Sequence, residues 1–166
     1  IALTDLGENT TVSNPVWGVT GQPVPANTAN SEYSAMVNQY ADARQIDQTT
    51  TVLDGIPGFV GGSDYEKMEK ARLLNSSEYT LNQALGYISL KTSLQTDQVL
   101  AVAYEYTYGG VTYQVGEFAS DITDVKKALF VKSLKNTSNN PRQGNWGLMM
   151  KNVYYLASSV EKEKFR

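Results

Sequence analysis

The sequence contains neither cysteine nor histidine. Disulfide bonds, thiol catalysis, zinc sites built from these residues and every histidine-dependent catalytic triad are therefore excluded. Carboxylates, lysine, tyrosine, serine and threonine are the side chains left for catalysis. Long apolar runs are also lacking, since none approaches the roughly 20 residues that a membrane-spanning helix needs.

A chain of 166 residues with 41% hydrophobic residues is long enough to bury one core. Residues 1–30 are rich in Thr, Asn, Gly and Pro and show little periodicity, so we expect an extended arm or loop. Trp17 is its large apolar anchor, and packing against the domain is favoured over contact with a partner. We expect residues 31–166 to form a single α+β domain that is a fragment of a much larger chain.

The most informative stretch predicts a β-hairpin that turns at Gly109-Gly110. Two runs rich in Val, Tyr and Thr flank this glycine pair, which suits a tight two-residue turn. One face of the hairpin is aromatic and the other is polar. We expect the polar face, with Glu105, Thr107 and Gln114, to be less buried than the aromatic face. The cross-strand pairs expected on the aromatic face are Tyr108 with Val111, Tyr106 with Tyr113 and Tyr104 with Val115.

The alternation of this hairpin fails once, at its far end. Simple pairing places Glu117 inside and Phe118 outside. A β-bulge at Gly116 reverses these two positions, and glycine is the residue that bulges prefer. The fold predicted is α+β, with an antiparallel sheet centred on the 99–118 hairpin and two or three short helices on one side.

Helical periodicity begins at the capping pair Asn30-Ser31, and its apolar stripe predicts an amphipathic helix that ends near residues 44–47. Residues 128–135 alternate like a strand but also suit a helix, and we favour a strand from near Leu129. The other predicted elements are a short strand at Asp47–Asp54, a turn with Phe59 inward, a polar helix from Ser63 or Asp64 to Arg72, a loop at Asn136–Asn145, and a short buried helix or strand at Trp146–Tyr155.

The net charge of −3 conceals an uneven distribution of charge. Residues 1–121 carry fourteen acidic and five basic side chains, whereas residues 122–152 carry one acidic and six basic side chains. The basic segment either pairs with the acidic part, is simply solvated, or offers a contact surface to an acidic partner. The candidate partner surface consists of Lys126, Lys127, Lys132, Lys135, Arg142 and Lys151.

No constellation of side chains predicts catalysis. Glu105 and Glu117 point to different faces unless the bulge forms, and two glutamates on a polar face are usually just solvated. Neither Asp5 with Glu8 nor Asp64 with Glu66 fits a calcium loop with ligands at alternate positions. We therefore expect no catalytic residues, no metal and no cofactor. Because the chain is acidic overall and lacks a nucleic-acid-binding motif, we expect no nucleic-acid partner either.

Three segments carry a resemblance to a known family. They are ARQIDQTTTVL from residue 43, LGYISLKTSLQTDQVLAVAYEYTYGGVTYQVGEF from residue 85, and WGLMMKNVYY from residue 146. With them, residues 33–166 resemble the SprA/Sov family, very large outer-membrane proteins of Bacteroidetes. Its members form the translocon of the type IX secretion system and support gliding motility. The arm at 1–30 matches least well.

The resemblance implies a function in transport and no catalytic residues. Members of the family form a large β-barrel pore through the outer membrane, with folded domains inserted between strands. The expected function is therefore a soluble structural domain of this translocon, located at the cell outer membrane. The expected partners are other secretion components, such as a partner outer-membrane barrel and a plug protein, together with secreted cargo. The alternatives are a surface adhesion or glycan-binding domain and, with least support, a carboxylate-dependent hydrolase.

Overall fold

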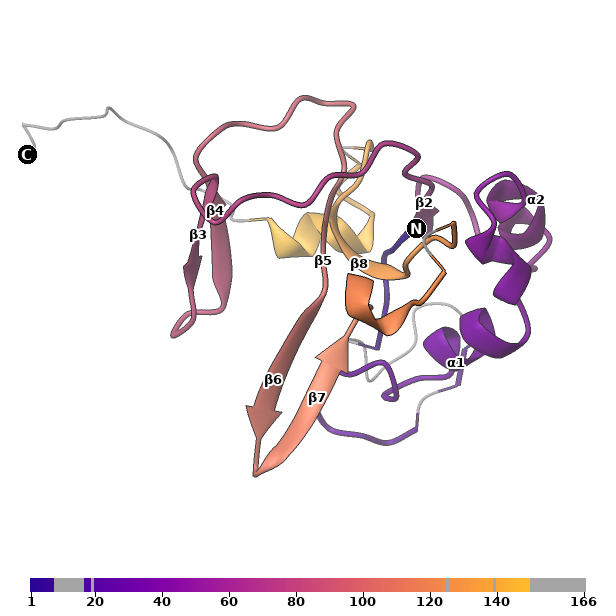
Figure 1. The fold of residues 1–166 in the computed structure, drawn as a ribbon, viewed down its shortest axis with the longest axis horizontal. Coiled ribbons are helices and arrows are strands. Elements are labelled where there is room, and N and C mark those ends of the chain that lie inside the picture. The colour runs from indigo at the N-terminus through magenta and orange to yellow at the C-terminus, as the bar shows by residue number, and fades with distance from the viewer. Residues whose placement is uncertain (8–16, 19, 125, 139, 150–166) are drawn as a thin grey trace, which may run out of the picture.

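The computed structural model describes residues 1–7, 17–18, 20–124, 126–138 and 140–149. These residues form an α+β fold with a small sheet and short helices, as the sequence predicts, and the two α-helices lie together on one side of the sheet (Figure 1). The helices are α1 (Glu32–Asn38), η1 (Ala41–Arg44), α2 (Thr49–Asp54), η2 (Ala119–Asp121) and η3 (Gly144–Leu148). The strands are β1 (Ala2–Leu3), β2 (Tyr65–Glu66), β3 (Tyr79–Asn82), β4 (Tyr87–Leu90), β5 (Leu100–Val102), β6 (Tyr104–Tyr108), β7 (Val111–Val115) and β8 (Val131–Lys135).

The largest sheet has four strands in the order β2-β1-β8-β5. Strand β1 pairs antiparallel with β2 and parallel with β8, so the start of the described chain lies in the middle of the sheet. Ala2, Leu3 and Leu6 are fully buried. Residues 1–7 are thus part of the core, although the arm to which they belong has little regular secondary structure.

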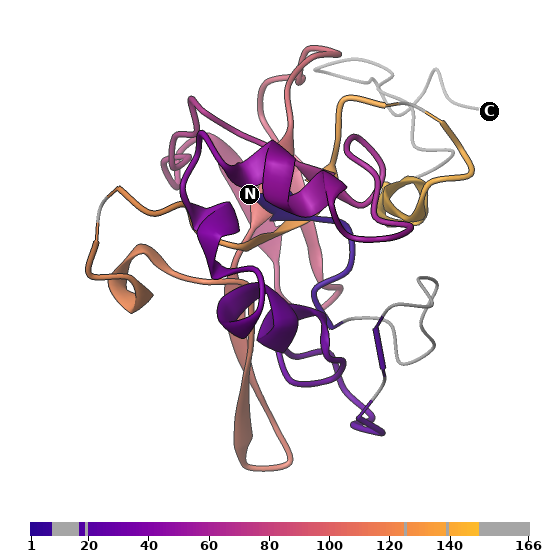
Figure 2. The ribbon, with the colours of Figure 1, turned by 90° about the vertical axis from the view of Figure 1, so that its right-hand side faces the viewer.

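The core lies between this sheet and the helical side of the molecule (Figure 2). Met36 of α1 and Leu53 of α2 are fully buried against it. Trp17 is 6% exposed and makes edge-to-face contacts with Tyr40 and Phe59, at centroid distances of 6.4 and 5.9 Å. The arm is therefore anchored on the domain by its tryptophan, as expected.

The predicted hairpin forms, with the predicted register throughout. Strands β6 and β7 pair antiparallel from Tyr108–Val111 to Tyr104–Val115. Gly109 and Gly110 have φ values of +59° and +80°, which is the type I′ geometry that favours glycine at both positions. Val115 is fully buried, whereas Glu105 and Thr107 are exposed, so the two faces differ in the predicted direction.

The end of this hairpin differs from the bulge interpretation. Gly116 has a φ of +78°, and an added Cβ atom there would lie 3.1 Å from the Ala103 Cβ atom. The chain nevertheless continues inward, and Glu117 is 4% exposed while Phe118 is half-buried. Glu117 is buried because a cation from another element, Arg44, lies in the core to receive it.

The hairpin also stands apart from the main sheet. Strands β6 and β7 form a two-stranded sheet of their own, and a second such sheet, β3–β4, was not predicted. The centre of the main sheet is β1 and β8, which belong to segments more than 100 residues apart in the chain. Strand β5, at the edge of that sheet, leads directly into β6 (Figure 1).

Two local predictions are wrong. The Thr-rich segment predicted as a strand is helix α2, because Thr49 and Leu53 lie one turn apart and are both buried. The Thr49 hydroxyl donates to the Ala43 carbonyl at 2.7 Å, which ties α2 to η1. These tertiary contacts override the β preference of threonine and valine.

The polar helix predicted from residue 63 to residue 72 is also absent: the structure has strand β2 there, followed by irregular chain. Tyr65 is 4% exposed and pairs with Leu3 across β1–β2. Charge pairs on an exposed helix contribute only about 0.2–0.5 kcal/mol each, so burial of one tyrosine decides the conformation.

The predictions for the last part of the described chain, after β7, agree better with the structure. Strand β8 begins at Val131, near the predicted Leu129, and residues 136–138 and 140–143 are irregular, as expected for a loop. Helix η3 covers residues 146–148 of the element predicted at Trp146–Tyr155, but this part is not buried as predicted, since Leu148 is 51% exposed. The rest of that element, from residue 150, lies outside the described residues.

Candidate functional site

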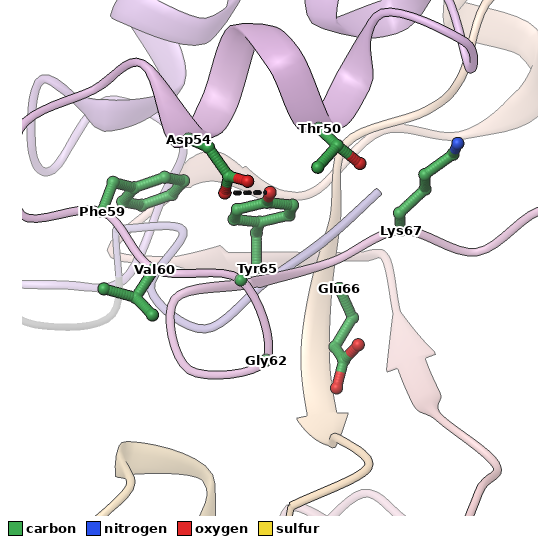
Figure 3. A pocket seen from close by; sticks show the side chains of 9 residues that line it. Thr50, Asp54, Phe59, Val60, Gly62, Tyr65, Glu66 and Lys67 are labelled. Atoms are coloured by element: carbon green, nitrogen blue, oxygen red, sulfur yellow. Dashed lines mark hydrogen bonds between the residues drawn. The ribbon is translucent and has the colours of Figure 1, made fainter.

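A shallow, open hollow of about 590 Å³ lies between α2, the glycine-rich turn and β2 (Figure 3). Tyr65 forms its floor, with Asp54 of α2 above it. The Tyr65 hydroxyl donates to Asp54 Oδ1 at 2.6 Å, and its ring stacks on Phe59 at a centroid distance of 5.5 Å. The remaining lining residues are Thr50, Val60, Gly61, Gly62, Glu66 and Lys67.

The polar groups of this hollow are already engaged. Burial, and next the hydrogen bond to Asp54, raise the pKa of Tyr65 to about 12, so its hydroxyl is a neutral donor at pH 7. The Glu66 carboxylate accepts hydrogen bonds from the Thr137 backbone N–H and hydroxyl, at 2.9 and 2.6 Å. Figure 3 shows Glu66 and Lys67 directed away from the tyrosine hydroxyl. No nucleophile with a neighbouring base emerges from this arrangement.

The hollow also lacks an open aromatic platform for a sugar ring. Phe59 and Tyr65 are only 5% and 4% exposed, and each covers the other. The large apolar side chain exposed beside them is Val60, at 56%. The aromatic rings of the hollow therefore belong to the core.

A buried ion pair links parts of the fold that are distant in sequence. The Arg44 guanidinium, at the end of η1, binds both carboxylate oxygens of Glu117, at 2.5 and 2.8 Å. Glu117 also accepts hydrogen bonds from the Tyr33 hydroxyl at 2.9 Å and the Phe130 N–H at 2.8 Å. Arg44 lies over the Phe130 ring at 4.3 Å and donates to the Ala128 carbonyl at 3.1 Å.

Arg44 and Glu117 are both buried, and the charge of each compensates the charge of the other. Burial, and next the hydrogen bond to Glu117, raise the pKa of Tyr33 to about 12. Burial, the largest single influence, opposes the charge on Arg44, but the hydrogen bonds and charge interactions with Glu117 and Tyr33 together outweigh it and raise the guanidinium pKa. Every oxygen of the carboxylate has donors, so its role is to join α1, η1 and the segment before β8. It offers no free group for chemistry.

The candidate glutamate pair is separated by this network. Glu105 is exposed on the hairpin, whereas Glu117 is bound to Arg44 in the core. The two carboxylates therefore do not face each other across a cleft. Among the residues that the structure describes, no group of three or more acidic side chains is placed to hold a metal ion.

The structure does not gather the basic segment into one surface. Lys132 is 4% exposed, and its ammonium donates to the Thr4 carbonyl. Lys135 donates to three carbonyls of one loop, those of Gln95, Thr96 and Gln98, at 3.1, 3.0 and 2.6 Å.

Three of the six predicted cations remain as exposed charges: Lys126, Lys127 and Arg142. The three described ion pairs are Arg44–Glu117, Lys67–Glu69 and Arg72–Glu78, so none of these exposed cations takes part in one. Lys151 lies outside the described residues. Lys132 and Lys135 have structural roles, because their ammonium groups take the place of water around carbonyl oxygens of the same chain. Among the described residues, the candidate partner surface is therefore reduced to Lys126, Lys127 and Arg142.

The hairpin β3–β4 combines exposed apolar side chains with a lack of charge. Between Glu78 and Lys91 there is no charged residue. Leu81 and Leu85 are 50% and 74% exposed, and Leu73, on the approach to the hairpin, is 94% exposed. The strand pairing puts four apolar side chains on one face, namely Tyr79, Leu81, Ile88 and Leu90.

The sequence contains a pattern that indicates this hairpin. The runs YTLN and YISL alternate with period two and flank the turn QALG, as hairpin strands do. The ion pair between Arg44 and Glu117 had no such signal, because its partners lie 73 positions apart.

Comparisons with known proteins add no identification, since no protein-family model and no curated protein sequence matches the chain. In the part of the chain described by the structure, every helix is too short or too polar to cross a membrane.

Proposed function

We propose that this chain is a structural domain of the outer-membrane translocon of the type IX secretion system, and that it docks other parts of the secretion machinery. Support comes first from the resemblance of residues 33–166 to the SprA/Sov family. The partners on this proposal are the partner outer-membrane barrel, the plug protein and secreted cargo, and the parent protein lies in the outer membrane. Secretion and gliding motility are the processes it serves.

The observation that carries the docking role is the uncharged hairpin β3–β4. Exposed hairpins are usually protected by charged side chains, because bare strands and leucines invite association. Here Leu81 and Leu85 are exposed on a segment without charge. A two-stranded sheet is marginally stable alone, so contact with a partner also stabilises the hairpin itself.

The alternative of a glycan-binding or adhesion domain has less support. It rests on the tyrosine-rich hairpin β6–β7, in which Tyr106 and Tyr113 stack at 5.5 Å. The Tyr106 hydroxyl donates to the Pro25 carbonyl at 2.5 Å, so the polar end that would bind a sugar is occupied.

The test uses the full-length parent protein in its own bacterium, carrying Leu81→Asp with Leu85→Asp. Loss of the partner barrel and plug protein from the purified complex, with reduced cargo in the medium and reduced colony spreading, is the expected result. Thr80→Asp with Gln83→Asp is the matched control, because it adds the same charge to exposed polar positions of the same hairpin. Normal complexes and secretion in the leucine variant would refute the docking role.

A further inference from the structure

The outer edges of β6 and β7 differ in their contacts with the rest of the chain. The outer edge of β7 is lined by the arm: Asn27 N–H donates to the Gln114 carbonyl at 2.8 Å. The Asn27 side chain also binds both backbone groups of Gly116, accepting at 2.8 Å and donating at 3.1 Å. One end of this edge, from Gln114 to Gly116, is thus covered from within the chain.

The outer edge of β6 is left open. In an antiparallel pair, backbone groups alternate between the partner strand and the outside. Because the Gln114 carbonyl points outward from β7, its cross-strand neighbour Glu105 presents its backbone outward from β6, and so does Thr107. No third strand joins β6 among the described residues, and Figures 1 and 2 both show the hairpin extending beyond the body.

The charge beside this edge is negative. Glu105 is the single charged residue from Tyr104 to Val115, and it is exposed. On the same face, Gln114 donates to the Asp121 carboxylate at 2.7 Å. A hydrogen bond from the Phe118 backbone, and next that from Gln114, hold the pKa of Asp121 below its usual range. The Glu105 carboxylate therefore lies on β6 itself, whereas the Asp121 carboxylate lies next to the neighbouring strand, β7.

We propose that the outer edge of β6 binds an extended, basic segment of another polypeptide as an added β-strand. The backbone groups of Glu105 and Thr107 supply main-chain hydrogen bonds, which give affinity in this mode of recognition. A Lys or Arg opposite Glu105 supplies a favourable cross-strand pair. This partner surface goes beyond the proposed function and does not depend on it.

A second copy of the chain is a poorer occupant of the same edge. Antiparallel pairing of β6 with itself about Tyr106 would place Glu105 opposite Thr107 of the other copy. The two Glu105 carboxylates would then lie diagonally across the seam, roughly 7–8 Å apart, where like charges repel. A basic segment meets no such opposition.

The test titrates the 166-residue chain with a blocked peptide, Thr-Lys-Val-Lys-Val-Lys-Thr, while amide hydrogen exchange and NMR shifts are recorded. The proposal expects slowed exchange at Glu105 and Thr107, and binding that weakens as salt rises. The same peptide with Glu in place of Lys should bind at least roughly tenfold more weakly. No binding below about 1 mM, or protection elsewhere, would overturn the proposal.

Two proline variants separate the edges. Thr107→Pro removes an outward N–H from β6, and Thr112→Pro removes the corresponding one from β7, since these residues are cross-strand partners. Both leave the hydrogen bonds between the strands intact, and edge strands tolerate proline. Thr107→Pro should weaken peptide binding roughly five- to tenfold, while Thr112→Pro changes it less than about twofold. Equal effects would contradict binding at β6.

Side-chain and self-association measurements complete the test. Glu105→Gln keeps the strand and should weaken binding about two- to fivefold, an effect that disappears at high salt. Sedimentation of the chain without peptide should show a monomer; a dimer that the peptide cannot dissociate would assign the edge to a second copy. These readouts are independent of secretion, so failure here leaves the docking role of β3–β4 standing.

Discussion

Replacement of Arg44 by methionine is expected to destabilise the domain strongly. The side chains of Arg44 and Glu117 are only 11% and 3% exposed, and their closest approach is 2.5 Å. Arg44→Met leaves the Glu117 carboxylate in the core with two of its four hydrogen bonds, those from Tyr33 and Phe130. Removing one partner of a buried ion pair costs about 3–5 kcal/mol, because the other charge remains without compensation.

That cost is large beside the roughly 5–15 kcal/mol by which domains are typically stable. Urea unfolding followed by tryptophan fluorescence measures it, since Trp17 is buried in the core. With a slope near 2 kcal/mol/M, the unfolding midpoint should fall by roughly 2 M urea while the slope stays constant. Combining Arg44→Met with Glu117→Gln should cost less than the sum of the single changes, because the orphaned charge is gone.

The matched control is an exposed ion pair of the same protein. Lys67 and Glu69 lie 2.9 Å apart, with side chains 25% and 65% exposed. Lys67→Met should change the free energy of unfolding by less than about 1 kcal/mol, as exposed pairs usually do. An Arg44→Met variant no less stable than Lys67→Met would refute the reasoning that burial makes the Arg44–Glu117 pair decisive.

Three further predictions concern pH, backbone and loop order. Burial raises the pKa of Tyr33 and Tyr65 to about 12, so their contribution to stability is complete below pH 10 and is lost as pH rises from 10 towards 12. Urea midpoints at pH 9 and 11 should show this loss of stability, and Tyr33→Phe should make the loss smaller. Gly7→Ala should prevent stable folding, because at φ +87° the alanine Cβ atom would lie 1.8 Å from a backbone carbonyl oxygen. Gly21→Ala, at φ +81° in open space, should lower the free energy of unfolding by only about 1–2 kcal/mol, as measured by thermal unfolding. Lys135→Met removes the ammonium that holds three loop carbonyls, and amide exchange at residues 95–98 should accelerate roughly tenfold; unchanged exchange would mean that the lysine does not order the loop.

Sequence patterns succeeded where a structure depends on near neighbours. Glycine at positions 109 and 110 permits positive φ at both, and the alternating residues on either side then have one register that puts the aromatic side chains on one face and buries Val115 at its inner end. The stripe of α1 likewise follows from helical spacing over a few residues, and Met36 on that stripe is fully buried. The helix nevertheless ends at Asn38 instead of near residues 44–47, and the separate short helix η1 follows it.

Patterns failed where one segment meets another that is distant in the chain. Thr49–Asp54 has the composition of a strand, yet burial of Leu53 and the bond from Thr49 to the Ala43 carbonyl make it a helix. The inward course of Glu117 after Gly116 depends on Arg44, which no local rule brings to that place.

The sequence by itself determined the turn, the register and the two faces of β6–β7, together with the absence of thiol and imidazole chemistry, because these depend on residue identity and short-range geometry. Only the tertiary structure decided that Lys132 and Lys135 bind carbonyls inside the domain instead of facing a partner. It also decided that Asn27 binds the Gln114–Gly116 end of the β7 edge, whereas no described strand pairs with the outer edge of β6. The physical reason is that a cation, a carboxylate or a strand edge has the same local pattern whether it is exposed or buried, and burial is set by contacts between segments far apart in the chain.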